Sequence, residues 1–327
     1  MKKPSTSIRF RFLPLALTIF LVLTAGAAFA ASYPAKNIRM IVPYSAGGGT
    51  DVMARAVAQF MEGALGTRIA VVNKPGASGA IGTAEVAEAR PDGYTIVMLS
   101  SNDYLLAPLM NKDPGFKLDD LKLIGSFNDT ANCIIVKNGS PFKTFDELIE
   151  YAKANPGRLT VSTSGDAHVF LGVMIGDVTG ARFSMVSYSG AGESLNSLMG
   201  GHVEAAIIDK RFVKQAEQGG CKALAVASDQ RYDILPDLPT MNELGYQVLD
   251  NQRRILAVPA KTPEAVVDTL TRAVLALGDM PEFKERLTAM SEVIMIETGA
   301  ELTAWATEAF TRFSGVVEAN KERFQKK

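Results

Sequence analysis

One unit recurs along this chain: an apolar strand, a loop of small residues, and a helix that begins inside that loop. Residues 38–42 are predicted to form the first strand and residues 43–49 the loop. Thr50 is the expected N-cap of a helix that runs to about Ala64 and stops at Gly66. Strands that alternate with helices in this way favour an α/β fold with parallel or mixed sheets flanked by helices.

These units fall into two groups, at residues 38–100 and 158–228. Two extended segments, 123–136 and 245–258, join the groups. This layout predicts two lobes connected by a hinge of two crossings, and lobes hinged in this way close on a ligand.

The lobes are assigned from the positions of the two crossings. We expect the first lobe to comprise residues 31–130 and 253–327, and the second to comprise residues 131–252. The long amphipathic helix that begins at Glu301 is expected to pack on the first lobe.

The first thirty residues are predicted to be a cleaved signal peptide. A basic segment leads into the apolar run 13–30, which closes on Ala28-Phe29-Ala30, the small-x-small pattern of a cleavage site after Ala30. A membrane anchor is the alternative, but no stop-transfer charges follow the run. We therefore expect an exported, periplasmic protein, and because Ala31 is not Cys it carries no lipoprotein signal.

Net charge argues against nucleic acid as a partner. The chain has 34 Lys and Arg against 35 Asp and Glu, and four of the basic residues lie in the predicted signal peptide. The remainder is acidic, whereas phosphate contacts depend on clustered Lys and Arg. We expect a soluble monomer that binds a small molecule.

The loop Tyr44-Ser45-Ala46-Gly47-Gly48-Gly49-Thr50-Asp51 is the most informative local feature. Its glycines let backbone N–H groups approach a ligand, and the following helix directs its positive dipole end into the same space. Loops 75–79, 162–165 and 188–192 are of the same type. Together they predict a cleft that binds a carboxylate, although any one of these loops could be only a tight connection.

Catalytic and cofactor motifs are absent from the sequence. It contains no Gly-x-x-x-x-Gly-Lys-Ser/Thr, no dinucleotide-binding Gly-x-Gly-x-x-Gly unit and no Gly-x-Ser-x-Gly elbow. His168 and His202 show no metal-ligand spacing with Cys133 or Cys221, so we expect neither a metal nor a cofactor. The two cysteines could pair after export or remain as buried thiols.

Longer motifs identify a resemblance. The segment Ile41-Val42-Pro43-Tyr44-x-Ala46-Gly47-Gly48-Gly49-Thr50-Asp51, then Asn73-Lys74-Pro75-Gly76-Ala77-x-Gly79 and Pro91-Asp92-Gly93-Tyr94-Thr95, resembles the substrate-binding proteins of tripartite tricarboxylate transporters, the Bug or TctC family. The resemblance extends over essentially the whole chain after the signal peptide, through Leu235-Pro236-Asp237-Leu238-Pro239-Thr240 to Thr262-Pro263.

That resemblance implies a type II-like periplasmic binding protein, which closes like a flytrap on a carboxylated solute and delivers it to the membrane subunits of the permease without catalysis. An exported hydrolase and a sensing protein remain the alternatives. The loops matching 44–51 and 76–79 are implied to hold the carboxylate, and those matching 162–168 and 188–190 to set specificity. The predicted ligand-binding residues are Tyr44, Ser45, Ala46, Gly47, Gly48, Thr50, Asp51, Ala77, Ser78, Gly79, Ser100, Asn102, Thr163, Ser164, His168, Tyr188, Gly190, Asp209 and Arg253.

The sequence departs from the family in the return crossing. Many relatives carry a Trp there, often followed by Arg, whereas this chain has Asn251-Gln252-Arg253-Arg254. If Arg253 faces the cleft, it is expected to pair with a second carboxylate of the ligand. Otherwise, Arg253 and Arg254 are an ordinary pair of surface charges.

Overall fold

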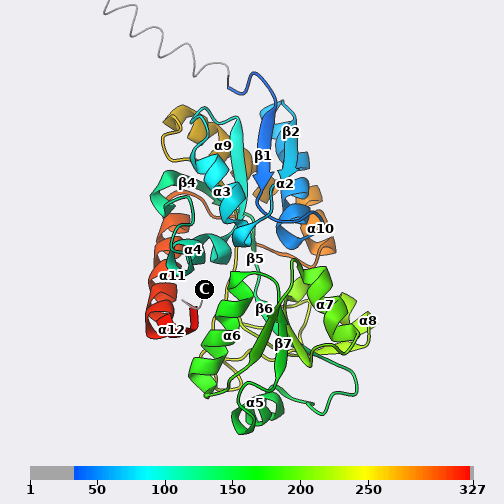
Figure 1. Cartoon of the computed structure of the whole chain (residues 1–327). Coiled ribbons are helices and arrows are strands. Elements are labelled where there is room, and N and C mark those ends of the chain that lie inside the picture. The colour runs from blue at the N-terminus through cyan, green and yellow to red at the C-terminus, as the bar shows by residue number, and fades with distance from the viewer. Residues whose placement is uncertain (1–32, 325–327) are drawn as a thin grey trace, which may run out of the picture.

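The computed structural model describes residues 33–324 and contains two five-stranded sheets, one above the other in Figure 1. The predicted signal peptide lies outside the described residues. The first sheet has the strand order β2-β1-β3-β11-β4. Its strands are β1 (Ile38–Val42), β2 (Ile69–Asn73), β3 (Thr95–Ser100), β4 (Leu121–Ser126) and β11 (Arg254–Pro259).

The second sheet is built from the middle of the chain and has the order β10-β6-β9-β7-β8. Its strands are β6 (Asn132–Lys137), β7 (Thr160–Thr163), β8 (Ser184–Ser187), β9 (Ala205–Asp209) and β10 (Cys221–Val226). Both sheets are mixed, because β11 runs antiparallel to β3 and β4, and β6 runs antiparallel to β9 and β10. Strands β1, β2 and β3 pair in parallel, and so do β7, β8 and β9. Strands β6 and β11 enter directly from the opposite lobe without a crossover helix, and the edge strand β10 pairs with β6, antiparallel.

Helices cover both sheets (Figure 1). Around the first sheet they are α2 (Gly49–Leu65), α3 (Ala80–Ala87), α4 (Ser101–Met110), α9 (Glu264–Asp279) and α10 (Pro281–Ala289). Around the second they are α5 (Phe145–Ala154), α6 (Asp166–Thr179), α7 (Ala191–Met199) and α8 (Val213–Gln218). The C-terminal helices are α11 (Gly299–Ala319) and α12 (Lys321–Phe324), and short 3-10 turns span Ala77–Gly79, Leu118–Asp120 and Lys210–Phe212.

Helix α2 begins two residues earlier than its sequence predicted. Gly48, not Thr50, is the N-cap, with extended backbone angles and no side-chain cap. Thr50 is instead buried in the first turn. The predicted stop is confirmed, because Gly66 takes the left-handed conformation and its N–H bonds to the carbonyl of Glu62.

The two crossings lie side by side at the hinge. Thr130 and Gln252 exchange backbone hydrogen bonds of 2.9 and 2.7 Å. The short strand β5 (Asn128–Asp129) pairs on its other side with β12 (Val293–Ile294), so a third segment joins the hinge.

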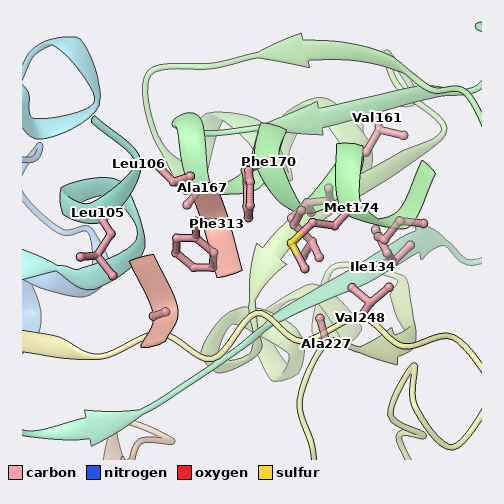
Figure 2. Packing of buried hydrophobic residues seen from close by; sticks show 14 of the residues in the cluster. Leu105, Leu106, Ile134, Val161, Ala167, Phe170, Met174, Ala227, Val248 and Phe313 are labelled. Atoms are coloured by element: carbon pink, nitrogen blue, oxygen red, sulfur yellow. The ribbon is translucent and has the colours of Figure 1, made fainter. Parts of the chain in front are cut away.

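An apolar core connects the two lobes and includes α11. Phe313 of α11 meets Phe170 of α6 edge-to-face, with 4.8 Å between ring centroids (Figure 2). On its other side α11 packs against α4 and β4 of the first lobe. The expectation that this helix packs on the first lobe is therefore incomplete, because α11 continues past α4 and reaches α6 (Figure 1).

Cys133 and Cys221 are both buried and unpaired; they lie on the neighbouring strands β6 and β10, but Cys133 faces Val226 and Cys221 faces Lys137. Within residues 33–324, no helix combines the length and apolar character that a bilayer crossing requires.

Candidate functional site

A cavity of about 130 Å³ lies between the two sheets, where strands from both lobes end. Loops after β1, β3, β7, β8 and β9 reach it, as the rule for open α/β sheets predicts. Its lining residues are Tyr44, Ser45, Gly48, Gly49, Thr50, Ser100, Asp103, Asn132, Ser164, Ala167, His168, Ser189, Gly190, Ala191, Asp209, Phe212, Gln252 and Arg254.

Several helices begin at this cavity, and three of them, α2, α6 and α7, have a glycine at the N-cap. Their N-cap residues are Gly48, Gly165 and Gly190, and none of these glycines can supply a side-chain cap. The first N–H groups of a helix have no partner within the helix, and they carry its partial positive charge. The cavity is therefore suited to an anion.

A salt bridge crosses the cavity floor between the lobes. Arg254, at the start of β11, donates from Nη2 to Oδ2 of Asp209, at the end of β9, over 2.9 Å. Burial alone raises the pKa of Asp209, but Arg254, Arg211 and Lys210 outweigh that effect and lower it. Asp209 therefore remains ionised and holds the Arg254 guanidinium in place.

Glycine at position 49 allows this guanidinium to approach α2. A Cβ atom there would lie 3.0 Å from Nη2 of Arg254 and 3.3 Å from the guanidinium carbon of Arg211. Two cationic groups thus lie against the N-terminus of α2, and both add to its attraction for an anion.

His168 contributes a neutral ring. Burial lowers its pKa to about 4. Its Nδ1 accepts a hydrogen bond from the backbone N–H of Ser164 over 3.1 Å, so the neutral ring carries its proton on Nε2. His168 is therefore a hydrogen-bond donor at the cavity at neutral pH.

The structure brings part of the predicted set together around the cavity. These residues are Tyr44, Ser45, Gly48, Thr50, Ser100, Ser164, His168, Gly190 and Asp209. The others do not line it: Ala46, Gly47, Asp51, Ala77, Ser78, Gly79, Asn102, Thr163, Tyr188 and Arg253. Of this second group, Ala46 and Gly47 are exposed, and Gly79 packs against the ring of Tyr44.

Several residues of the second group hold the loops in shape. Asp51 accepts hydrogen bonds from the Gly47 N–H, at 2.8 Å, and from the Asn73 amide, at 2.9 Å. It also pairs with Arg55. These contacts fix the loop before α2, so Asp51 acts on the cavity indirectly.

The side chains of Thr163 and Tyr188 are also used within the second lobe. Thr163 bonds to the hydroxyl of Ser187 at 3.2 Å, and Tyr188 bonds to that of Ser197 at 2.5 Å. The first contact joins the ends of β7 and β8, and the second joins the loop after β8 to α7.

Asn102 belongs to a buried network behind the cavity. Its amide donates to Oδ1 of Asp250 over 2.6 Å, and the amide of Asn132 donates to Oδ2 over 2.6 Å. Burial raises the pKa of Asp250 to about 7 despite these donors. The network connects α4, β6 and the return crossing.

The structure also corrects the expectation for Arg253. Its side chain pairs with Glu297 and stacks on Trp305, with 4.1 Å from the guanidinium carbon to the ring centroid. It lines a separate pocket behind the hinge, whereas Arg254 faces the cavity between the lobes. The second carboxylate contact expected of Arg253 therefore has no basis at that position.

Sequence reasoning missed half of the cavity lining. The missed residues are Gly49, Asp103, Asn132, Ala167, Ser189, Ala191, Phe212, Gln252 and Arg254. Most are immediate neighbours of predicted residues on the same loops, so extending each loop by one residue would have found them. Asn132 and Phe212 carried no comparable signal.

Comparison with known proteins agrees with this architecture. Residues 53–320 match the family described as the tripartite tricarboxylate transporter family receptor. Protein BugT of Bordetella pertussis is 32% identical over 313 residues, covering 93% of this chain and 96% of BugT.

Solved structures show the same fold. The periplasmic binding protein BugD is 31% identical, with a TM-score of 0.80 covering 88% of this chain and 98% of that one. MatC from Rhodopseudomonas palustris with bound malate is 24% identical, with a TM-score of 0.79 covering 87% of this chain and 100% of MatC. Because the family match and BugT both span most of its length, the chain belongs to the tripartite tricarboxylate transporter receptors, the Bug family of two-lobed solute-binding proteins.

Proposed function

We propose that this protein captures a small organic acid in the cavity between its lobes and delivers it to a tripartite tricarboxylate-type membrane permease. The observation that carries the proposal is the convergence of the N-termini of α2 and α7, whose glycine N-caps supply no side-chain cap, and the Arg254 guanidinium on one cavity. Backbone amides and a held guanidinium are the groups that recognise a carboxylate. The family is one of non-enzymatic binding proteins, and MatC, which shares the fold, holds malate.

The cellular setting follows from the family and from the N-terminal sequence. Receptors of this family are periplasmic. We infer that the chain is exported by its signal peptide, cleaved after Ala30, and acts as a monomer. We also infer that its lobes divide near residues 131 and 252, where the paired crossings run.

Thermal melting of the mature protein with a panel of carboxylates tests the proposal. A ligand at a hundredfold excess over its Kd adds about 2.7 kcal/mol to the free energy of unfolding. At least one small carboxylate should raise the melting temperature, while the matched primary amides and alcohols should not. A panel in which no carboxylate stabilises the protein contradicts the proposal.

Neighbouring arginines offer a matched pair of variants. Arg254→Met should weaken binding by about tenfold or more, because a charge-assisted contact to the carboxylate is lost. Arg253→Met removes the same charge one residue away, behind the hinge, and should leave the affinity unchanged. Each shift is read against the variant's own ligand-free melting temperature, since both substitutions break a salt bridge. Equal losses of affinity in the two variants would show that Arg254 has no specific part in binding.

A further inference from the structure

Asp103 brings a carboxylate of the protein itself into the cavity. It lies in the first turn of α4 in the first lobe, is partly exposed, and lines the cavity. Its Oδ1 accepts a hydrogen bond from the backbone N–H of Ala167, at the start of α6 in the second lobe, over 3.1 Å. One of the three helix N-termini is thus already occupied by an anion from across the cleft.

The N-cap position of α6 lies beside this carboxylate. The N-cap of α6 is Gly165, and a Cβ atom at that position would lie 3.5 Å from Oδ1 of Asp103. Because Gly165 has no side chain that could accept from the first turn, Asp103 takes the place of an N-cap residue. Helices α2 and α7 also have glycine N-caps, Gly48 and Gly190, and neither N-cap residue has a side chain that could accept from the first turn.

The charge of Asp103 is poorly compensated. Arg254 favours its ionised form, but Arg254 is already paired with Asp209 at 2.9 Å. Asp166, in the first turn of α6, adds a second negative charge, and His168 on the same helix is neutral. Tyr44, in the loop before α2, also faces Asp103 and is not ionised.

Protonation of Asp103 is therefore sensitive to pH near neutrality. Burial, with a smaller contribution from Asp166, raises its pKa to about 7, although the Ala167 N–H, Arg254 and the Ser100 side chain oppose the shift. Above pH 7 the side of the cavity at α6 carries a carboxylate, and below pH 7 it carries a neutral carboxyl group.

We propose that Asp103 is a specificity-determining residue that selects ligands with one carboxylate and, at the other end, an uncharged or cationic hydrogen-bond donor. This inference rests on the proposed function, in which the ligand carboxylate lies at α2 and Arg254. A second carboxylate at the α6 end would lie against Asp103, and like charges placed together across an interface are strongly unfavourable. A hydroxyl, amide or ammonium group donates to Asp103 instead.

Matched ligand pairs test this inference. Each pair has the same chain length, from four to eight carbons, and differs only at the distal end: 4-hydroxybutyrate or succinamate against succinate, and the longer homologues likewise. Isothermal titration at pH 8 should show wild-type protein preferring the hydroxy or amide member by about tenfold or more. In Asp103→Asn this preference should disappear or reverse, because an amide oxygen still accepts from Ala167 while the charge is gone.

Two controls separate charge selection from structural damage. Asp166→Asn removes a carboxylate from the first turn of α6 that does not line the cavity, and should keep the wild-type order of ligands. Lowering the pH from 8 to 6 should erase the preference in wild-type protein, because Asp103 becomes protonated, and should leave the order in Asp103→Asn unchanged.

The outcomes are distinguishable from failure of the proposed function. If neither member of any pair binds, and no other carboxylate binds, the proposed function itself fails. If carboxylates bind but Asp103→Asn keeps the wild-type order, or if wild-type protein already prefers the dicarboxylates at pH 8, the role of Asp103 is refuted.

Discussion

Replacement of Phe313 by alanine measures how strongly α11 couples the two lobes. The ring of Phe313 is fully buried between α4 of the first lobe and α6 of the second, and it contacts Phe170 at 4.8 Å between centroids (Figure 2). Deleting a buried phenyl group loses its transfer free energy and leaves a cavity, which together cost about 3–5 kcal/mol. We expect Phe313→Ala to lower the free energy of unfolding by that amount.

Urea denaturation followed by circular dichroism and by fluorescence provides the assay. The chain has one tryptophan, Trp305, which lies on the same helix and reports the release of α11 directly. Wild-type protein should unfold in one transition seen equally by both probes, because the apolar core is continuous between the lobes. In Phe313→Ala the fluorescence midpoint should fall to a lower urea concentration.

The control is Phe310→Ala on the same helix. Phe310 is only partly buried, so its loss should cost less than half as much. A double-mutant cycle between Phe170→Leu and Phe313→Leu should give a coupling of about 0.5–1.5 kcal/mol, the value of an aromatic pair. A loss below 1 kcal/mol for Phe313→Ala, or two separate wild-type transitions, would refute the idea that α11 couples the lobes.

Three further outcomes are expected. Gly82→Ala should lower the melting temperature, because the new Cβ would lie 2.7 Å from a backbone oxygen. The control Gly63→Ala places its Cβ in open space, with no atom within 4 Å, and should stabilise α2 by about 0.5–1 kcal/mol. Asp250 should lower wild-type stability between pH 4 and pH 7 by up to about 1.4 kcal/mol per pH unit, because the folded chain binds its proton more tightly than the unfolded chain does. Asp103, whose pKa is also raised, acts in the same direction, so urea midpoints measured for Asp250→Asn should show a smaller fall but not its complete loss. Cys133 and Cys221 should react with a thiol reagent only after unfolding, as mass spectrometry would show.

Local sequence signals were sufficient to predict the positions of the repeated strand–loop–helix units. The β1–α2 unit was predicted almost to the residue, because an apolar strand, a glycine-rich loop and a glycine stop each act within a few positions. The direction of β6 and β11 was not predictable in the same way. Each of these strands is placed by long-range pairing with strands of its new lobe, and their antiparallel direction follows from entry at the hinge.

For the site, the positions of the loops were largely predictable from the sequence, but the directions of their side chains were not. Three of the four glycine loops predicted from sequence, 44–51, 162–165 and 188–192, do meet at the cavity, because parallel strands deliver their carboxyl ends to one edge of the sheet. The fourth, 75–79, does not line it. Asp51 and Asn102 lie on those loops, yet their side chains bond to Asn73 and Asp250. Composition of a loop therefore indicates where it lies, but not which of its side chains point into the cavity.

Arg253 and Arg254 show how the register of one strand determines which side chain faces the cavity. Successive side chains of an extended strand point to opposite faces, so one of two adjacent arginines faces the cavity and the other faces away. Which one does so depends on pairing with β3, where Arg254 is opposite Ser100. Cross-strand partners share a face, and Ser100 lines the cavity, so Arg254 lies beside the ligand site and Arg253 stacks on Trp305 behind it. The pairing of two strands about 150 positions apart in the chain thus determines that Arg254, and not Arg253, faces the cavity, where we propose that it binds the carboxylate of the solute.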